Sequence, residues 1–366
     1  MDNIYYNFPE DFERMEREDC WCALIIGGRS TGKTYGALKY HLENHIPFVF
    51  IKRTAEDVKL ICAGNGKIGT KQKDDSWKSA DFSPFKAINR DLNTNIQSFQ
   101  ILDGLGGFWV CDSDGSPCGA PIGYIVALSM VSKVRGFDLS DCDSIIFDEF
   151  IPQQWERISR KEGDQFLDLY KTVQRDRELR GRKPLKMICL ANSADITAPV
   201  LDILEVTDLI ADMNAMGQES YVFENRGVLI HLIKTSDAIL NVEKHSSLYR
   251  AMGETNWGRM AFGNEFAYND FSNVGKENMK NFVPFVAYRY RGKTVYIYRK
   301  DEKIYFTTSP NNQVRVYNLD REVEQKAFYY DYVIDLKDEL VDDRIMFKNY
   351  SMYNLLNNYT NIFKVR

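Results

Sequence analysis

The sequence has no long apolar stretch and no paired metal-binding motif. None of its 366 residues falls in a run that approaches the roughly 20 apolar residues a membrane helix requires. The first residues lack the basic and then apolar order of a secretory signal, so we expect a protein that stays in the cytosol and has no membrane partner. The seven cysteines form no C-x2-C pairs with matching histidines, which favours reduced, mostly buried thiols over a zinc site or disulfides.

Positive charge is not in excess either. The 47 Lys and Arg residues are outnumbered by 52 Asp and Glu residues, which gives a formal net charge of −5. A protein coated in nucleic acid would carry the opposite balance. Any contact with DNA is therefore expected to be local and made by a small set of basic residues, which suits a protein that grips and releases its partner.

Composition and length indicate a globular protein with room for more than one domain. Hydrophobic residues make up 44% of the chain and charged residues 27%, and no segment is of low complexity, which argues against a disordered or fibrous chain. A chain of 366 residues can form two domains, or one large domain with an appendage.

Short apolar segments typical of buried strands alternate with helical patterns in the first part of the chain. Helical spacing follows the first such strand at residues 33–44, and it recurs at residues 163–180. This order predicts an α/β fold with a mostly parallel sheet and helices on both faces, ending near residue 231. The expected strands are residues 22–26, 48–53, 122–130, 144–147 and 186–190.

The rest of the chain predicts two further parts. Residues 232–280 are richer in polar residues and predict a small helical linker or lid. Residues 281–366 predict an α+β domain, in which strands are followed by a helical tail from residue 322. The expected domains are therefore 1–231, 232–280 and 281–366. Strand-like alternation in the last of them occurs at residues 282–290, 294–299 and 303–308.

A glycine-rich loop lies between the first expected strand and the first expected helix. Residues 27–34 read G-G-R-S-T-G-K-T and match the P-loop pattern G-x4-G-K-[ST] in full. In such a loop backbone N–H groups surround the phosphates of ATP, Lys33 reaches the β and γ phosphates, and the Thr34 hydroxyl ligates Mg2+. The flanking strand and helix argue against a chance glycine loop. The expected nucleotide-binding residues here are Gly27, Gly28, Arg29, Ser30, Thr31, Gly32, Lys33 and Thr34.

Two acidic residues end another expected strand. Asp148 and Glu149 follow residues 144–147, and open α/β sheets bind ligands where their strands end. We expect Asp148 to hold Mg2+ through water and Glu149 to activate the attacking water as general base. An ordinary strand end capped by acids is the alternative, against which the intact P-loop argues. This pair indicates the additional-strand, catalytic-glutamate (ASCE) class of ATPases rather than nucleotide kinases, which need no base for water.

Two polar residues near these motifs allow more than one interpretation. Asn192 follows the apolar residues 187–191, where it would lie beside the γ-phosphate or simply turn the chain. Arg29 could reach the phosphates or report the bound nucleotide to a neighbouring subunit. It could also have neither role, because a P-loop tolerates nearly any residue at that position.

Two basic clusters offer candidates for a residue that acts across a subunit interface. Ring ATPases complete the site of one subunit with an arginine from the next, which stabilises charge in the transition state. Arg135 lies in K-V-R-G at residues 133–136, and Arg175 lies in R-D-R-E at residues 175–178. For either cluster, a solvated face of a helix or loop is the alternative.

In this order the motifs resemble the phi29-like DNA-packaging ATPases, or DNA encapsidation proteins, of small podoviruses with protein-primed genomes. The resemblance implies a motor that hydrolyses ATP to translocate double-stranded viral DNA into a procapsid, as a homopentameric ring. Arg175 matches the family's trans-acting arginine finger, and Arg135 falls where the family has a second trans-acting basic residue, a lysine. The resemblance rests on residues 25–34, 144–151, 175–178 and 189–192, and it covers the first 230 residues well.

The resemblance also implies partners and a place of action. The partners are double-stranded DNA, the viral portal or connector and further copies of the chain; some relatives dock on a packaging RNA, and the sequence leaves that partner open. The motor would act in the host cytoplasm, transiently at the portal vertex, and would be absent from the mature virion. Residues 281–366 would be a vestigial RNase H-type nuclease that contacts nucleic acid or the portal. Its strand at 282–290 has no carboxylate where a two-metal nuclease needs one.

Other functions fit some of the same motifs. One is a different ASCE translocase, such as a helicase or a large terminase with an active nuclease. Another is a nucleotide-binding scaffold that hydrolyses nothing, against which the intact Lys33, Thr34, Asp148 and Glu149 argue.

Overall fold

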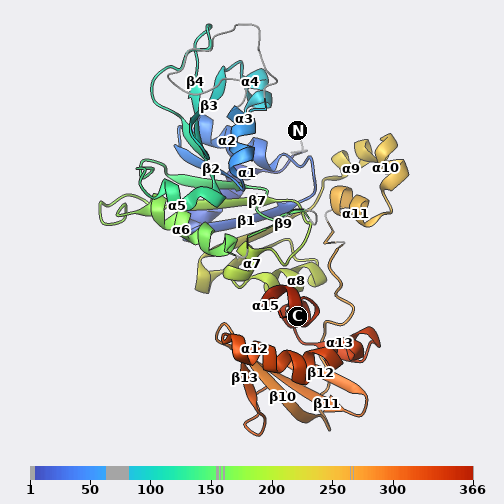
Figure 1. Cartoon of the computed structure of the whole chain (residues 1–366). Helices are drawn as coiled ribbons and strands as arrows, with labels where there is room; N and C mark the ends of the chain where they lie inside the picture. Colours follow the sequence, from blue (N-terminus) through green and yellow to red (C-terminus); the bar gives the residue numbers. More distant parts are fainter. Residues whose placement is uncertain are drawn as a thin grey trace. The chain divides into compact units, whose positions relative to one another are not determined.

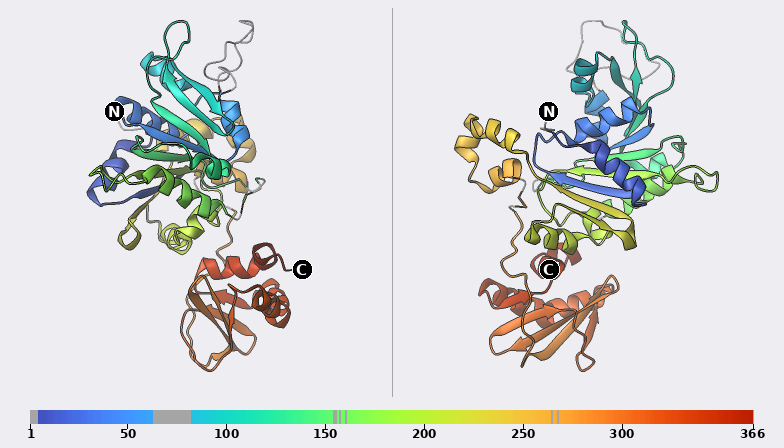
Figure 2. Two further views of the ribbon diagram at one scale, coloured as in Figure 1. Left: turned by 60° about the vertical axis from the view of Figure 1, so that its left-hand side comes forward. Right: turned by 180° about the vertical axis from the view of Figure 1, so that it is seen from behind.

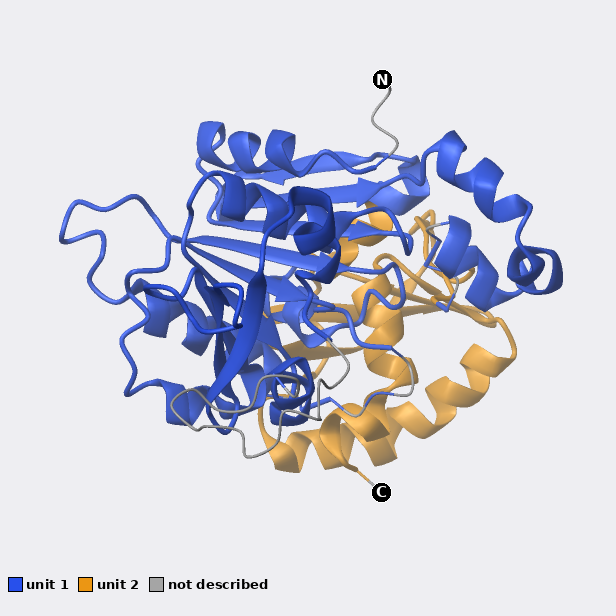
Figure 3. Ribbon diagram, turned by 90° about the horizontal axis from the view of Figure 1, so that it is seen from above, with its two compact units in different colours: residues 1–205, 213–268 blue, residues 206–212, 269–366 orange. Residues whose placement is uncertain are grey.

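The computed structural model describes residues 5–62, 82–153, 156, 158, 159, 161–263, 265, 266 and 268–365 (Figure 1, with further views in Figure 2). The chain divides into two compact units (Figure 3). Unit 1 comprises Met1–Glu205 and Met213–Tyr268, and unit 2 comprises Val206–Asp212 and Asn269–Arg366. The finer division expected from the sequence, with boundaries at residues 231 and 280, stays a prediction.

Unit 1 is built on a nine-stranded sheet with the order β3-β4-β5-β2-β6-β7-β1-β9-β8. The central strands from β5 to β9 pair in parallel, whereas β3, β4 and β8 join antiparallel at the two edges. The predicted mostly parallel sheet is therefore confirmed. The strands are β1 (Cys22–Gly27), β2 (Phe48–Lys52), β3 (Ile96–Leu102), β4 (Leu105–Val110), β5 (Gly123–Ala127), β6 (Ser144–Asp148), β7 (Lys186–Ala191), β8 (Ser220–Phe223) and β9 (Val228–Ile233).

Helices cover both faces of this sheet (Figure 2). Ile146 of β6 belongs to one apolar cluster with Leu38 and Phe8. The next residue, Phe147, points to the other face and meets Phe166, with ring centroids 6.3 Å apart. A strand that is apolar at successive positions needs such cover on each face. The helices of this part are α1 (Phe8–Arg17), α2 (Lys33–Glu43), α3 (Ala55–Cys62), α4 (Lys86–Leu92), η1 (Leu128–Met130), α5 (Val131–Val134), α6 (Glu162–Gln174), α7 (Pro199–Ile203) and η2 (Glu224–Arg226). Helix α8 (Thr207–Met216) is divided, with its residues up to Asp212 in unit 2 and the rest in unit 1.

Helix α6 is shorter than the sequence pattern predicted. It ends at Gln174, whereas the helical spacing predicted a helix over residues 163–180. Arg175 ends the helix with a φ of 44°, an uncommon left-handed value that interrupts the helical backbone. Arg177 is then only 1% exposed and donates to the backbone carbonyl of Cys142. The segment after Arg175 is therefore held by polar contacts of its own rather than by a continued apolar helix face.

The remaining part of unit 1 is helical, as expected for the start of the predicted linker. It contains α9 (Asp237–Lys244), α10 (Ser247–Met252) and α11 (Asn256–Gly263). Among the residues that the structure describes, no helix is long and apolar enough to cross a membrane. The cysteines are free thiols, and all except Cys118 are buried.

Unit 2 holds a five-stranded sheet with the order β13-β10-β11-β12-β14. Strands β10 to β12 follow one another antiparallel, and β13 and β14 join in parallel at the two edges. The turn between β10 and β11 has positive φ at Arg291 (48°) and Gly292 (75°), as a tight hairpin turn requires. The predicted α+β fold is confirmed. The elements are β10 (Val283–Tyr290), β11 (Lys293–Lys300), β12 (Lys303–Thr307), β13 (Val316–Asn318), α12 (Glu322–Phe328), a π-helical turn η3 (Tyr329–Val333), α13 (Ile334–Val341), β14 (Ile345–Phe347), α14 (Tyr350–Asn357) and α15 (Tyr359–Phe363).

A buried histidine joins α2 to β6 in unit 1. His41 is 1% exposed, with its Nδ1 2.7 Å from the carbonyl oxygen of Ala37 and its Nε2 2.6 Å from Oγ of Ser144. Because a carbonyl oxygen only accepts, Nδ1 carries the proton and Nε2 accepts from the Ser144 hydroxyl. Burial lowers the pKa of His41 to about 4, although the hydrogen bond to Ala37 opposes this shift.

Mild acid is therefore expected to destabilise the protein through His41. Between pH 6.5 and about pH 4, His41 is protonated in the unfolded chain but not in the folded chain. The free energy of unfolding therefore decreases as the pH is lowered through this range, by roughly 3 kcal/mol in total. Urea unfolding at pH 7 and about pH 5 measures this, and His41→Gln should lose less stability on acidification than the wild type. The exposed control His45→Gln should behave as the wild type; an unchanged pH dependence in His41→Gln would contradict the prediction.

Candidate active site

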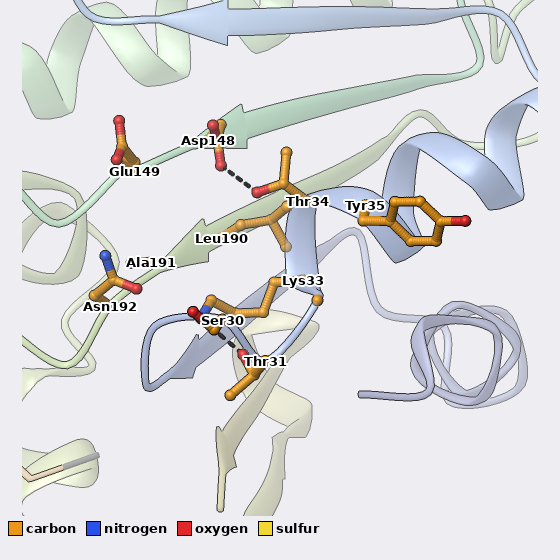
Figure 4. A pocket seen from close by; sticks show the side chains of 11 residues that line it. Ser30, Thr31, Lys33, Thr34, Tyr35, Asp148, Glu149, Leu190, Ala191 and Asn192 are labelled. Carbon is orange, nitrogen blue, oxygen red and sulfur yellow. Dashed lines mark hydrogen bonds between the residues drawn. The ribbon is translucent and has the colours of Figure 1, made fainter. Parts of the chain in front are cut away.

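A pocket lies in unit 1 where β1, β6 and β7 end (Figure 4). These strands are neighbours in the sheet and run parallel, so their carboxyl ends meet at one edge. The pocket has a volume of about 250 Å³. Its lining comes from three separate parts of the sequence: Ser30, Thr31, Gly32, Lys33, Thr34 and Tyr35, then Asp148 and Glu149, and finally Leu190, Ala191 and Asn192.

The loop between β1 and α2 needs glycine at two positions for different reasons. Gly32 has a φ of 84°, a left-handed value that side chains disfavour, and it starts α2. A Cβ on Gly27 would lie 2.9 Å from Cβ of Ile233 on the adjacent β9, so that position has no room for a side chain. The amide of Tyr6 donates to the carbonyl oxygen of Thr31 (3.0 Å), which ties the segment before α1 to the loop.

Lys33 curls back over this loop. Its Nζ donates to the carbonyl oxygens of Gly27 (3.1 Å) and Gly28 (2.6 Å) and to Oγ1 of Thr31 (3.1 Å). Burial lowers the pKa of Lys33 to about 8, and the nearby carboxylate of Asp148 limits the fall. An ammonium group held by neutral oxygens keeps its charge available to an anion in the pocket.

The loop and the acidic strand end are in direct contact. Oγ1 of Thr34 donates to Oδ1 of Asp148 at 2.8 Å (Figure 4). Asp148 is the last residue of β6, and Glu149 follows it with a φ of 58° and a side chain that is 63% exposed. Asn192 follows β7 and lies on the same side of the pocket as Glu149, away from Tyr35 (Figure 4).

Lys52 belongs to the site and was missed from the sequence. Its Nζ lies 2.8 Å from Oδ2 of Asp148 and 3.3 Å from Oε2 of Glu149, and its side chain is 17% exposed. Burial lowers the pKa of Lys52, but the two carboxylates outweigh burial and raise it overall. Lys52 ends β2, which pairs in parallel with β6. The sequence did indicate that Lys52 lies near the carboxyl end of an expected strand, residues 48–53. It did not indicate that this strand lies beside β6, and only that neighbourhood brings Lys52 to Asp148.

The three predicted arginines lie outside the lining of the pocket. Arg29 is exposed on the loop, and its amide donates to the carbonyl oxygen of Ala261 in α11 (3.2 Å). Arg135 pairs with Asp168 on α6 at 2.5 Å. Arg175 donates to the carbonyl oxygen of Phe137 at 2.6 Å and pairs with Asp138 at 3.3 Å. Within one chain, the side chains of Arg135 and Arg175 therefore contact the surroundings of α6, and the backbone of Arg29 contacts α11.

Comparison with known proteins agrees with the fold. No curated protein sequence matches the chain. The solved structure titled "The Phi-28 gp11 DNA packaging Motor" matches with a TM-score of 0.60 at 15% identity, covering 100% of this chain and 99% of that one. "The bacteriophage Phi-29 viral genome packaging motor assembly" matches with a TM-score of 0.59 at 16% identity, covering 98% and 99%. At these identities the likeness shows the fold.

A family model identifies the chain by its sequence. The model of the podovirus DNA encapsidation protein (Gp16) matches residues 119–358, which is well over half of the chain. The match includes the Asp148-Glu149 strand end, Asn192 and most of unit 2. The chain therefore belongs to the podovirus DNA encapsidation protein (Gp16) family.

Proposed function

We propose that the chain is an ATP-hydrolysing motor that drives double-stranded DNA into a viral procapsid. The observation that carries this proposal is the contact between Thr34 and Asp148, which brings the phosphate-binding loop and the acidic strand end into one pocket. Membership of a DNA encapsidation family supports DNA as the substrate that is moved. The residues of the pocket support ATP hydrolysis as the reaction that drives the movement.

The residues of the pocket fit a nucleotide with its magnesium ion. Thr34 and Asp148 offer a hydroxyl and a carboxylate oxygen, which are the hard donors that Mg2+ prefers. When bound, Mg2+ neutralises charge on the phosphates. Lys33 and the amides of the loop would hold the phosphates of ATP, with the remaining loop residues Gly27 to Gly32 shaping the cradle.

Glu149 and Asn192 would act on the water that attacks the γ-phosphate. Both line the pocket beyond Asp148, on the side away from Tyr35 (Figure 4). A glutamate carboxylate there can accept a proton from the water that attacks the γ-phosphate. The amide of Asn192 can hydrogen-bond the γ-phosphate or that water. Lys52, which holds Glu149 at 3.3 Å, keeps the carboxylate beside Asp148 until nucleotide enters.

The motor would work as a ring, in which Arg175 enters the site of the neighbouring subunit. Arg175 is free of the pocket of its own chain and partly exposed, and its position at the end of α6 leaves it at the surface. Arg135, on the segment that packs against α6, would assist it, and Arg29 would report the nucleotide state. A pentamer is the expected ring.

The partners and place of action follow from the family. The DNA, the portal or connector and further copies of the chain are the proposed partners, with a packaging RNA left open. Action would be transient, at the portal vertex of the procapsid in the host cytoplasm, with the motor absent from the mature virion. The solved relatives are named as packaging motors, which supports this setting.

No specific observation favours the helicase or nuclease alternatives. Strand β10 carries no Asp or Glu. In the described part of the chain, no group of three or more His, Cys, Asp or Glu side chains is placed to hold a metal ion. Unit 2 is therefore proposed as a nucleic-acid or portal contact and not as a nuclease.

The role of Glu149 can be tested by removing its basicity. Glu149→Gln keeps the size of the side chain, so it is expected to bind ATP normally but to hydrolyse it about 100- to 10,000-fold more slowly and to package no DNA. Phosphate release and packaging into procapsids measure the two effects. Glu43→Gln, at an exposed position on α2, is the control. Normal hydrolysis by Glu149→Gln would refute the proposed mechanism.

Lys52 should stabilise the site when no nucleotide is bound. Lys52→Met leaves two adjacent carboxylates without their cation, so we expect a loss of roughly 1–3 kcal/mol in unfolding free energy. Mg2+ with a non-hydrolysable ATP analogue should then raise the melting temperature more in this variant than in the wild type. Lys39→Met, which removes an exposed pair with Glu43, serves as control. An equal rise in both proteins would count against this role.

The interface role of Arg175 can be tested by mixing subunits. Arg175→Ala and Lys33→Ala rings should each be nearly inactive, and a mixture should regain part of the ATPase activity, because some interfaces then pair an intact loop with an intact arginine. Arg180→Ala, at a side chain 71% exposed, should remain active on its own. If mixing restores nothing, Arg175 acts within its own chain or not at all.

A further inference from the structure

Arg53 donates hydrogen bonds to several groups around the end of β6, where the proposed base Glu149 lies. It follows Lys52 at the end of β2, and its side chain is 15% exposed. Its Nη2 donates to the carbonyl oxygens of Glu149 (3.0 Å) and Phe150 (3.1 Å). Its Nε and Nη1 donate to the carboxylates of Glu162 (2.9 Å) and Glu156 (2.9 Å). A planar guanidinium is the side chain that can serve so many acceptors at fixed angles.

The backbone that Arg53 holds has an uncommon conformation. Glu149 has a φ of 58°, which is rare for a residue with a side chain and persists only where its surroundings enforce it. On one side, the amide of Phe150 donates to the carbonyl oxygen of Leu190 at the end of β7 (3.1 Å). On the other side, the two carbonyl groups that follow accept from Arg53. The peptide that carries the proposed base is therefore fixed from both directions.

The carboxylate that pairs with Arg53, that of Glu162, is buried in the core. Glu162 is the first residue of α6 and is 2% exposed. Burial raises the pKa of Glu162, and its hydrogen bonds with Arg53 oppose that rise. Nε and Nη2 of Arg53 face its two carboxylate oxygens, at 2.9 and 3.3 Å, in the fork-to-fork geometry that fixes direction as well as distance. Arg53 is therefore oriented by a buried partner.

We propose that Arg53 is a positioning residue for hydrolysis, which holds the Glu149 peptide in its left-handed conformation and so aims the carboxylate at the attacking water. This inference rests on the proposed role of Glu149 as general base. Among the residues that line the pocket, Arg53 hydrogen-bonds the backbone carbonyl of Glu149, so it acts through that residue. The neighbouring Lys52 instead hydrogen-bonds the side-chain carboxylate of Glu149. Arg53 therefore acts on the backbone of Glu149 and Lys52 on its side chain.

Arg53→Lys is the decisive variant. Lysine keeps the positive charge that buried Glu162 requires, but a single ammonium cannot reach both backbone carbonyls and both carboxylates. We expect kcat for ATP to fall about 10- to 100-fold, because small displacements of a catalytic group cost that much, while the affinity for a fluorescent ATP analogue stays at the wild-type value. Arg90→Lys, at a side chain that is 77% exposed and paired with its neighbour Asp91, is the matched control.

A second variant separates positioning from folding. Glu162→Gln weakens the buried ion pair but leaves the bonds from Arg53 to the Glu149 and Phe150 carbonyls. A purely structural Arg53 predicts that both variants lose melting temperature, kcat and nucleotide affinity in parallel. Positioning predicts a loss of kcat in Arg53→Lys that exceeds the loss in Glu162→Gln, even where Glu162→Gln has the lower melting temperature.

The outcomes distinguish this inference from the proposed function. Wild type and Glu149→Gln are measured in the same series. If the wild type hydrolyses ATP and Glu149→Gln does not, but Arg53→Lys has the kcat of Arg90→Lys, the positioning role is wrong and the proposed function stands. If Glu149→Gln hydrolyses ATP as the wild type does, the proposed function fails first.

Discussion

The hydrogen bond between Thr34 and Asp148 is the contact on which the site depends. It joins residues 114 positions apart, and it forms because β1, β7 and β6 are parallel neighbours whose ends meet at one edge. The register sets it: Ile26 lies opposite Ala191, and Asp148 lies opposite Leu190. A slip of one residue would turn Asp148 to the opposite face of the sheet. Register within the sheet therefore sets where Asp148 lies in the pocket.

Oppositely charged side chains are paired at this edge of the sheet. Lys52 faces Asp148 and Glu149, and Arg53 faces Glu162. Removing one partner of a buried pair strongly destabilises a protein, whereas a complete network is tolerated. Lys33 differs, since the acceptors of its ammonium group are two carbonyl oxygens and a hydroxyl. In the part of the chain that the structure describes, the hydrogen bonds of Lys33 thus commit its charge to no carboxylate, unlike those of Lys52 and Arg53.

The sequence predicted features that lie within one short segment, and it did not predict those that depend on which strands are neighbours in the sheet. The P-loop and the Asp148-Glu149 pair were readable because each is a short motif attached to one strand, and the parallel sheet followed from the alternation of strands and helices. Lys52 and Arg53 were not readable, because their importance comes from β2 lying beside β6, which no local pattern states. The early end of α6 was missed for a related reason. The apolar spacing up to Val173 was correct, but the left-handed φ of Arg175 and the buried contacts of Arg177 depend on tertiary structure.

The segment ahead of α1 has a practical consequence. The amide of Tyr6 donates to the carbonyl oxygen of Thr31, and Cβ of Tyr5 lies 3.2 Å from where a side chain on Gly32 would begin. A fluorophore attached at Tyr5 itself would thus disturb the phosphate loop. For enzymology and single-molecule work, such labels are better attached at exposed turns of unit 1, for example at Ser113 or Asp114.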